Sequence, residues 1–239
     1  MNFFSSIFLA PLPSLIWLSF YLRKDKHPEP NRLVIKIFFL GVLIVPLAGI
    51  SEWLFSLVSE KFSFLGTIFV LVVAFAAIEE ILKYLVVKFG ILKNPEFDEP
   101  VDAMIYMIIA GLGFAAAENI YLISQIPLEN ESVIQTLEFL TSRFLGATFL
   151  HALACGIVGY FLAVSLLIGS RLKKVFVWGG MLAATLLHSI FNYIIILNSS
   201  GEINDMTRNL FLIITLVSGA FIVSLMFKKV KKYRSICKI

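Results

Sequence analysis

Charged residues are scarce in this chain. Asp, Glu, Lys and Arg make up 15% of its 239 residues, whereas 59% are hydrophobic. A soluble domain has about 25% charged and 45–50% apolar residues, so the composition excludes an ordinary soluble enzyme or binding module. Together with a mean hydropathy of +0.91, it predicts a polytopic protein embedded in the lipid bilayer. A net charge of +4 gives no reason to expect a nucleic-acid partner.

Several motifs that would define a site are also missing. Only two cysteines occur, Cys155 and Cys237, and their spacing supports neither a disulfide framework nor a cysteine metal site. The HExxH signature of soluble zinc proteases and the GxSxG signature of serine hydrolases are both absent. The first apolar stretch lacks a basic start and a small-x-small cleavage site before Arg23, so we expect no cleaved signal peptide. No internal repeat is found.

Long apolar runs dominate what is present, and each can cross a bilayer as a helix. The segments 23–30 and 94–100 between them contain prolines and charges. A proline removes a backbone donor and restrains the residue before it, so these segments cannot be helix interior. We predict an all-α fold, a single membrane domain over residues 1–239 with about seven transmembrane helices, or eight if one span is split or re-entrant. The predicted spans are 2–22, 33–58, 63–89, 101–126, 139–168, 176–198 and 208–227.

Lysines and arginines mark alternate connections between these spans. They concentrate in the first, third and fifth loops and in a basic tail from about residue 228, whereas the second, fourth and sixth loops have few. Basic residues favour the cytoplasmic side of a membrane. The alternation therefore predicts an N-terminus outside the cell and a C-terminus in the cytoplasm.

Charged residues inside the third predicted span need an explanation, because a carboxylate at the bilayer centre costs roughly 2.5–3.5 kcal/mol. Glu79, Glu80 and Lys83 all lie there. Glu79 and Lys83 are four residues apart and share a helix face, so we expect them to pair. Glu80 points to a different neighbour. A pair that only fixes helix packing would leave one glutamate unexplained, which favours a functional site.

Candidate partners for these glutamates occur at membrane depth in the next three spans. Glu118 and Asn119 lie in the fourth span, His151 near the middle of the fifth, and His188 with Asn192 near the middle of the sixth. An interhelical hydrogen bond would explain Asn119, but not Glu118. A lone buried histidine is usually structural. Two histidines at similar depth, beside two helices that carry glutamates, favour a common site.

Other polar or small residues of the chain have structural explanations. Gly111 and Gly113 allow another helix to approach the fourth span closely. Asp102 stands near the start of that span, where a carboxylate accepts orphan amide protons, so we expect it to cap the helix or to support the site from outside. His27 lies in a loop and is expected to stay outside the site.

These residue types suit the activation of water. A desolvated glutamate can act as a general base toward water. Two histidines and a carboxylate can also hold a divalent metal with an open position, and Asn192 can donate a hydrogen bond to a developing oxyanion. Two other functions use the same residues: a proton- or cation-coupled transporter, in which they form a relay, and a non-catalytic scaffold. The missing internal repeats weigh against a transporter.

The order and spacing of these motifs resemble the PrsW family of intramembrane proteases. The resemblance covers roughly residues 15–195. The motifs that carry it are the basic loop at 20–30, EExxK at 79–83, the segments 96–102 and 111–119, and the histidine motifs at 151–152 and 188–192. The family is similar in turn to the CAAX prenyl protease and bacteriocin-immunity (Abi) proteins, which carry comparable glutamate and histidine motifs on a helical membrane core.

The resemblance implies an intramembrane endopeptidase of a prokaryotic cell membrane, classed among the metallopeptidases. Its implied substrates are membrane-anchored proteins, including anti-sigma factors. The predicted catalytic residues are Glu79, Glu80, Glu118, His151 and His188. The predicted ligands of a divalent metal, with zinc as the first candidate, are Glu118, His151 and His188. The predicted supporting residues are Lys83, Asn119, Asn192 and Asp102. Of the two adjacent glutamates, Glu80 is favoured for activating water and Lys83 for pairing with the other.

Overall fold

Helices make up most of the part of the chain that the structure describes. The computed structural model describes residues 7–24, 27–59, 67–125, 133–168 and 170–233, and no strand occurs among them. The helices are α2 (Leu12–Leu22), α3 (Asn31–Leu43), α4 (Val45–Ser59), α5 (Thr67–Gly90), α6 (Pro100–Ser124), α7 (Val133–Leu145), α8 (Ala147–Leu167), α9 (Ser170–Ser199) and α10 (Asp205–Val230). The predicted all-α fold class is confirmed.

Each predicted span corresponds to one helix or to two consecutive helices. The segments long and apolar enough to cross a membrane are Asn31–Ser59, Pro100–Ser124, Ile134–Leu167, Leu172–Ser199 and Asp205–Val230. The first predicted span is a shorter apolar helix, Ile7–Leu22, and the third is α5, which has 24 residues. This is the architecture of an integral membrane protein. Residues 2–6, 63–66 and 126 of the predicted spans, and Cys237, lie outside the described residues.

Two of the spans are split into two helices. α3 ends at Leu43 and α4 begins at Val45. Pro46 follows directly, and because it has no N–H the helical hydrogen-bond ladder is interrupted there. Gly146 separates α7 from α8 with φ −104° and ψ −105°, which is not a helical conformation. The expectation of a possible split span is met at both places.

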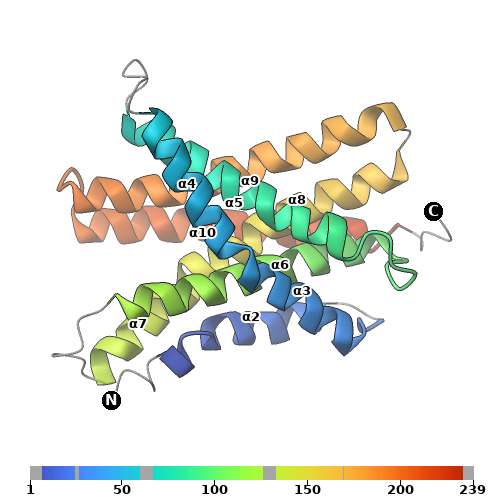
Figure 1. The fold of residues 1–239 in the computed structure, drawn as a ribbon, viewed down its shortest axis with the longest axis horizontal. Coiled ribbons are helices and arrows are strands. Elements are labelled where there is room, and N and C mark those ends of the chain that lie inside the picture. Colours follow the sequence, from blue (N-terminus) through green and yellow to red (C-terminus); the bar gives the residue numbers. More distant parts are fainter. Residues whose placement is uncertain (1–6, 25–26, 60–66, 126–132, 169, 234–239) are drawn as a thin grey trace.

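The core is built around α6, which crosses the middle of the molecule (Figure 1). Every residue of α6 from Pro100 to Ala116 is buried, and the helix packs against α8, α3 and α2. A Cβ atom on Gly113 would collide with the carbonyl oxygen of Phe38 in α3, and one on Gly159 of α8 would lie 2.5 Å from the Cα atom of Met104. The prediction that small residues in α6 admit another helix is therefore confirmed.

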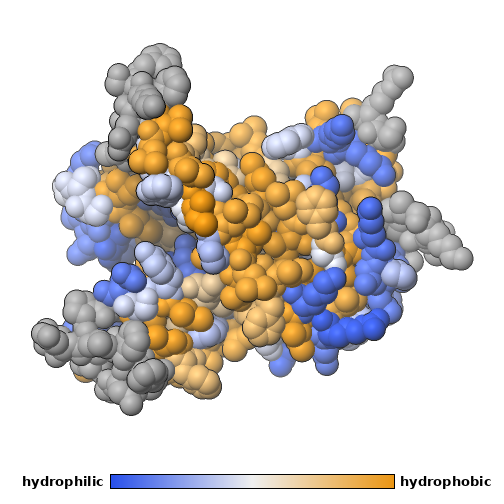
Figure 2. All heavy atoms as spheres, viewed as in Figure 1, coloured by the Kyte–Doolittle hydropathy of each residue, from blue (hydrophilic) through white to orange (hydrophobic). Residues whose placement is uncertain are grey.

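α2, α9 and α10 run along the long axis of the molecule, whereas α3 and α4 cross it obliquely (Figure 1). Hydrophilic residues lie toward both ends of the molecule, with hydrophobic residues between them (Figure 2). The C-terminal ends of α2, α5, α8 and α10 gather at the right end in Figure 1. There the Lys36 ammonium donates to the carbonyl oxygen of Gly90 at 2.8 Å. His27 lies 2.6 Å from Glu99 at this end, outside the site, as expected.

Candidate active site

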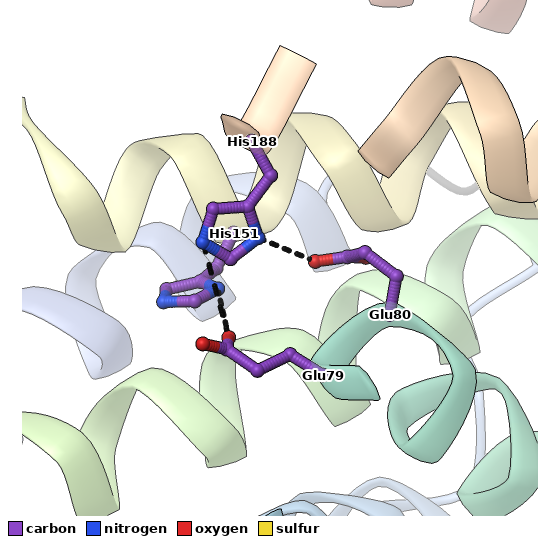
Figure 3. A group of neighbouring side chains, drawn as sticks. All are labelled: Glu79, Glu80, His151 and His188. Carbon is purple, nitrogen blue, oxygen red and sulfur yellow. Dashed lines mark hydrogen bonds and ion pairs between the residues drawn. The ribbon is translucent and has the colours of Figure 1, made fainter. Parts of the chain in front are cut away.

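Three helices bring two glutamates and two histidines together. Glu79 and Glu80 come from α5, His151 from α8 and His188 from α9 (Figure 3). All four are buried, and one candidate ligand atom from each lies within 4.8 Å of the others. The two imidazole rings are 5.1 Å apart, edge to face. Residues separated by up to 109 positions in the sequence thus form one polar cluster inside an apolar bundle.

Lys83 connects the members of this cluster. Its ammonium donates to Glu79 at 3.0 Å and to Glu80 at 2.8 Å, and lies 2.8 Å from Nδ1 of His151. The side chain is completely buried and sits 4.4 Å above the ring centroid of Phe114. A lysine ammonium has no lone pair to offer, so Nδ1 of His151 is the acceptor. The proton of a neutral His151 ring is then on Nε2.

The two adjacent glutamates are not equivalent. Oε1 of Glu80 accepts from Lys83 and lies 3.0 Å from Nδ1 of His188, and the side chain is completely buried. Oε2 of Glu79 accepts from Lys83 but lies 3.9 Å from both His151 Nδ1 and His188 Nε2, which is too far for a hydrogen bond. The Glu79 side chain keeps 10% of its surface exposed. Glu80 is therefore held on two sides, whereas Glu79 is less constrained.

Glu118 lies at the edge of the cluster and is held by a residue from α7. Its Oε2 accepts from Arg143 and lies 3.1 Å from Nε2 of His151, which donates to it. Arg143 also donates to Asn119 Oδ1, and Asn119 Nδ2 donates to Thr148 at 3.1 Å. The interhelical hydrogen bond expected for Asn119 is present. Glu118 contacts the site but does not belong to the compact group of four.

Two predicted supporting residues lie apart from the cluster. Asp102 accepts from the backbone N–H groups of Asp98 at 3.0 Å and Glu99 at 2.8 Å, which forms a capping box at the start of α6. The capping expected from the sequence is confirmed. Asn192 is half-buried one turn beyond His188 on α9, and within the described residues no hydrogen bond joins it to the cluster.

Three residues near the cluster were not predicted. Arg143 and Glu52 are isolated charges inside predicted spans, the same signal that singled out the α5 glutamates, and it could have found them. Glu52 of α4 is half-buried and close enough to Glu79 and Glu118 for their charges to interact. The free thiol of Cys155 lies 3.8 Å from Oε2 of Glu80, and nothing in its sequence context indicates this position.

The chemistry of the donor set fits a divalent metal ion. Two imidazoles and two carboxylates are donors that zinc and related ions accept. With both histidines neutral, the three contacting glutamates (79, 80 and 118) and the two cations (Lys83 and Arg143) leave one negative charge, which favours binding of a cation. His188 also shows the arrangement usual for a metal-binding histidine, with one ring nitrogen held by a carboxylate and the other turned toward the cluster. For Nδ1 of His151 to bind the ion, the Lys83 ammonium would have to leave that nitrogen and keep its contacts to the two glutamates.

Comparison with known proteins gives a consistent result. The model of the PrsW family of intramembrane metalloproteases matches residues 29–226. Protease PrsW of Oceanobacillus iheyensis is 32% identical over 185 residues, 77% of this chain and 79% of the relative. Protease PrsW of Geobacillus kaustophilus is 28% identical over 81% of this chain and 80% of the relative, and that of Bacillus subtilis is 27% identical over 80% and 83%. No solved structure matches the chain.

Proposed function

Because the chain belongs to the PrsW family of intramembrane metalloproteases, we propose that its buried Glu/His cluster hydrolyses peptide bonds of membrane-anchored proteins with activated water. The observation that carries the proposal is the meeting of Glu79, Glu80, His151 and His188 at one buried point. Burying these groups in an apolar bundle is costly. Lys83 offsets part of that cost, but a purely structural ion pair does not need two further histidines.

Glu79 is the better candidate for the residue that activates water, in place of the Glu80 that the sequence favours. Glu80 is completely buried, and one of its oxygens is engaged by both Lys83 and His188. Within the part of the chain that the structure describes, Glu79 accepts from Lys83 alone, and 10% of its side chain is exposed. A general base must reach the water molecule directly. Glu80 then orients His188 through Nδ1, which leaves His188 Nε2 turned toward Glu79 and the reacting water.

The proposed reaction needs one base and one oxyanion donor. Glu79 takes a proton from water as the water oxygen bonds to the scissile carbonyl carbon, and the C=O electron pair moves onto the carbonyl oxygen. Asn192 donates a hydrogen bond to that oxyanion. When the C–N bond breaks, Glu79 passes its proton to the leaving nitrogen, which departs as an amine. Glu118 and Arg143 hold His151 in place from the other side.

We propose zinc as the metal, held by Glu80, His151 and His188 of the compact group, which leaves Glu79 free to act as the base. When bound, a divalent ion polarises a carbonyl group and lowers the pKa of water. Glu118 remains a proposed ligand only if the ion draws it away from Arg143. Equilibrium dialysis tests the site without any activity assay: we expect about one Zn²⁺ per chain for the wild type and weaker binding for His188→Ala. Equal binding by both proteins would contradict a zinc site at this position.

We also propose the substrates, the membrane and the orientation of the protein. Membrane-anchored proteins, anti-sigma factors among them, are the proposed substrates, and the surrounding lipid is that of a prokaryotic cell membrane. The clustered basic ends of the helices support a cytoplasmic C-terminus and an external N-terminus for this single-domain chain. The His188-to-Asn192 motif supports a relation to the CAAX prenyl protease and Abi proteins.

The three histidines of the chain provide a matched test. Wild type, His151→Ala, His188→Ala and His27→Ala are purified, placed in liposomes and mixed with a panel of tagged single-span membrane proteins. We expect wild type and His27→Ala to cleave at least one of them, and both cluster variants to lose cleavage while remaining folded. If the wild type cleaves none, or if folded His188→Ala cleaves at the wild-type rate, the proposed function is wrong. An ion flux through the same liposomes would instead support a transporter.

A further inference from the structure

A cavity of about 570 Å³ opens beside the catalytic cluster, at the end of the molecule away from the gathered basic helix ends. Its walls come from the junction of α7 and α8, residues 191–199 at the C-terminal end of α9 and the first half of α10. The outline of the molecule is indented there, at the left edge in Figure 2. The volume lies within the range of about 300–1,000 Å³ that is usual for ligand sites.

Helical spacing places this cavity next to both catalytic histidines. Ala147 lines the cavity and lies one turn before His151 on α8, and Phe191 lines it about one turn after His188 on α9. One turn of helix advances about 5.4 Å. Arg143 forms part of the same wall, and its guanidinium binds Glu118, which contacts His151. The wall of the cavity therefore lies about one helical turn from each histidine.

The polar groups of the wall suit an uncharged, unwound peptide. Arg143 is already bound by Glu118 and Asn119, and Arg208 by Asn198 at 2.8 Å and Asp205 at 3.0 Å, so neither arginine needs an anion. The Ser199 hydroxyl donates to its own helix at 2.9 Å and keeps lone pairs for a peptide N–H. Backbone groups outside a helix must find partners at membrane depth, and the few polar side chains in this mostly apolar wall are available as partners.

We propose that this cavity binds the unwound peptide segment next to the scissile bond of a membrane-anchored substrate. The proposal rests on the proposed function, because the segment must reach Glu79 and the two histidines. A bond inside an intact helix has its carbonyl group engaged and crowded. Binding the neighbouring residues in extended form presents that bond to the cluster, while apolar residues of α10 hold the side chains. The Arg143 side chain then lies between the bound peptide and the Glu118 carboxylate that contacts His151.

Two adjacent isoleucines of α10 provide the test. Ile213 lines the cavity and Ile214 does not, although they are similarly exposed, at 59% and 53%. Each is changed to Trp, and kcat/KM is measured with a single-span reporter that the wild type cleaves. We expect Ile213→Trp to lose at least about tenfold, because contacts of one group in a pocket are worth roughly 10–200-fold. Ile214→Trp should stay within about twofold of wild type. Equal kcat/KM for both variants would overturn the cavity proposal and leave the proposed function intact.

Photocrosslinking separates binding from cleavage. A benzophenone amino acid replaces Ile213 or Ile214 in a Glu79→Gln background, and the same reporter is added. We expect a crosslink from position 213 and little from position 214. No crosslink from 213, or equal crosslinks from both positions, would refute peptide binding in the cavity. If the proposed function itself is wrong, the wild type will cleave no reporter, which is a different result from a missing crosslink.

Discussion

Replacing Lys83 by Met removes an ammonium that contacts both α5 glutamates. The Lys83 ammonium lies 3.0 Å from Glu79, 2.8 Å from Glu80 and 2.8 Å from His151, and no part of its side chain is exposed. Removing one partner of a buried ion pair costs about 3–5 kcal/mol, because the remaining charge is left uncompensated. For a domain of 150–250 residues each kcal/mol lowers Tm by about 2–4 °C, so we expect Tm to fall by roughly 6–20 °C.

Thermal unfolding of the purified protein in detergent, followed by tryptophan fluorescence, measures this change. Lys88→Met is the matched control, because Lys88 lies on the same helix but is exposed. A surface substitution of this kind changes stability by about 0.5 kcal/mol or less. The double variant Lys83→Met/Glu80→Gln should be more stable than Lys83→Met alone, because it removes one of the stranded carboxylates.

Two outcomes would refute this reasoning. If Lys83→Met unfolds at the same temperature as Lys88→Met, the buried ammonium does not hold the cluster together. If the double variant is less stable than Lys83→Met, the loss does not come from uncompensated charge. In either case the explanation of how the bundle tolerates Glu79 and Glu80 would have to be replaced.

Three further predictions concern the fold and the cluster. Asp102→Ala removes two hydrogen bonds of the α6 capping box. The free energy of unfolding should fall by about 1 kcal/mol, which lowers Tm and leaves kcat unchanged. A changed kcat would show that Asp102 takes part in the reaction. Gly113→Val forces a side chain against Phe38 and should lower the free energy of unfolding by about 1–3 kcal/mol. The control is Gly49→Val, where nothing lies within 4 Å of the added side chain, and it should be tolerated. Equal Tm values for the two variants would contradict the close contact of α3 and α6. Arg143→Gln leaves Glu118 without its cation and should lower kcat, with partial rescue by Arg143→Lys; a wild-type kcat would show that Glu118 needs no such support.

The sequence predicts the helices well because their signals are local. Apolar runs of spanning length and proline-containing breaks are enough to define the spans, and each corresponds to a helix or a helix pair. The breaks at Pro46 and Gly146 are harder to place, because a single proline or glycine within an apolar run is often tolerated in a membrane helix. The Gly146 break matters for the site, since it separates the helix of Arg143 from that of His151.

Only part of the candidate site can be predicted from the sequence. The spacing of Glu79 and Lys83 on one helix predicts their pairing, and the similar depth of His151 and His188 predicts that they meet. The contact of Arg143 with Glu118 depends on how α7 packs beside α6, which no local pattern specifies. The same is true of Cys155, whose thiol lies 3.8 Å from Glu80 and packs against Gly111, where a Cβ atom would lie 2.4 Å from the sulfur.

The most direct test of this account is the kcat of Glu79→Gln with a reporter that the wild type cleaves. Loss of a general base lowers the rate by about 10²–10⁴-fold, so we predict a fall of that size in a protein that remains folded at the assay temperature. Glu138→Gln, an exposed glutamate on α7, is the matched control and should cleave normally. A folded Glu79→Gln protein that cleaves at the wild-type kcat would contradict the assignment of Glu79 as the residue that activates water.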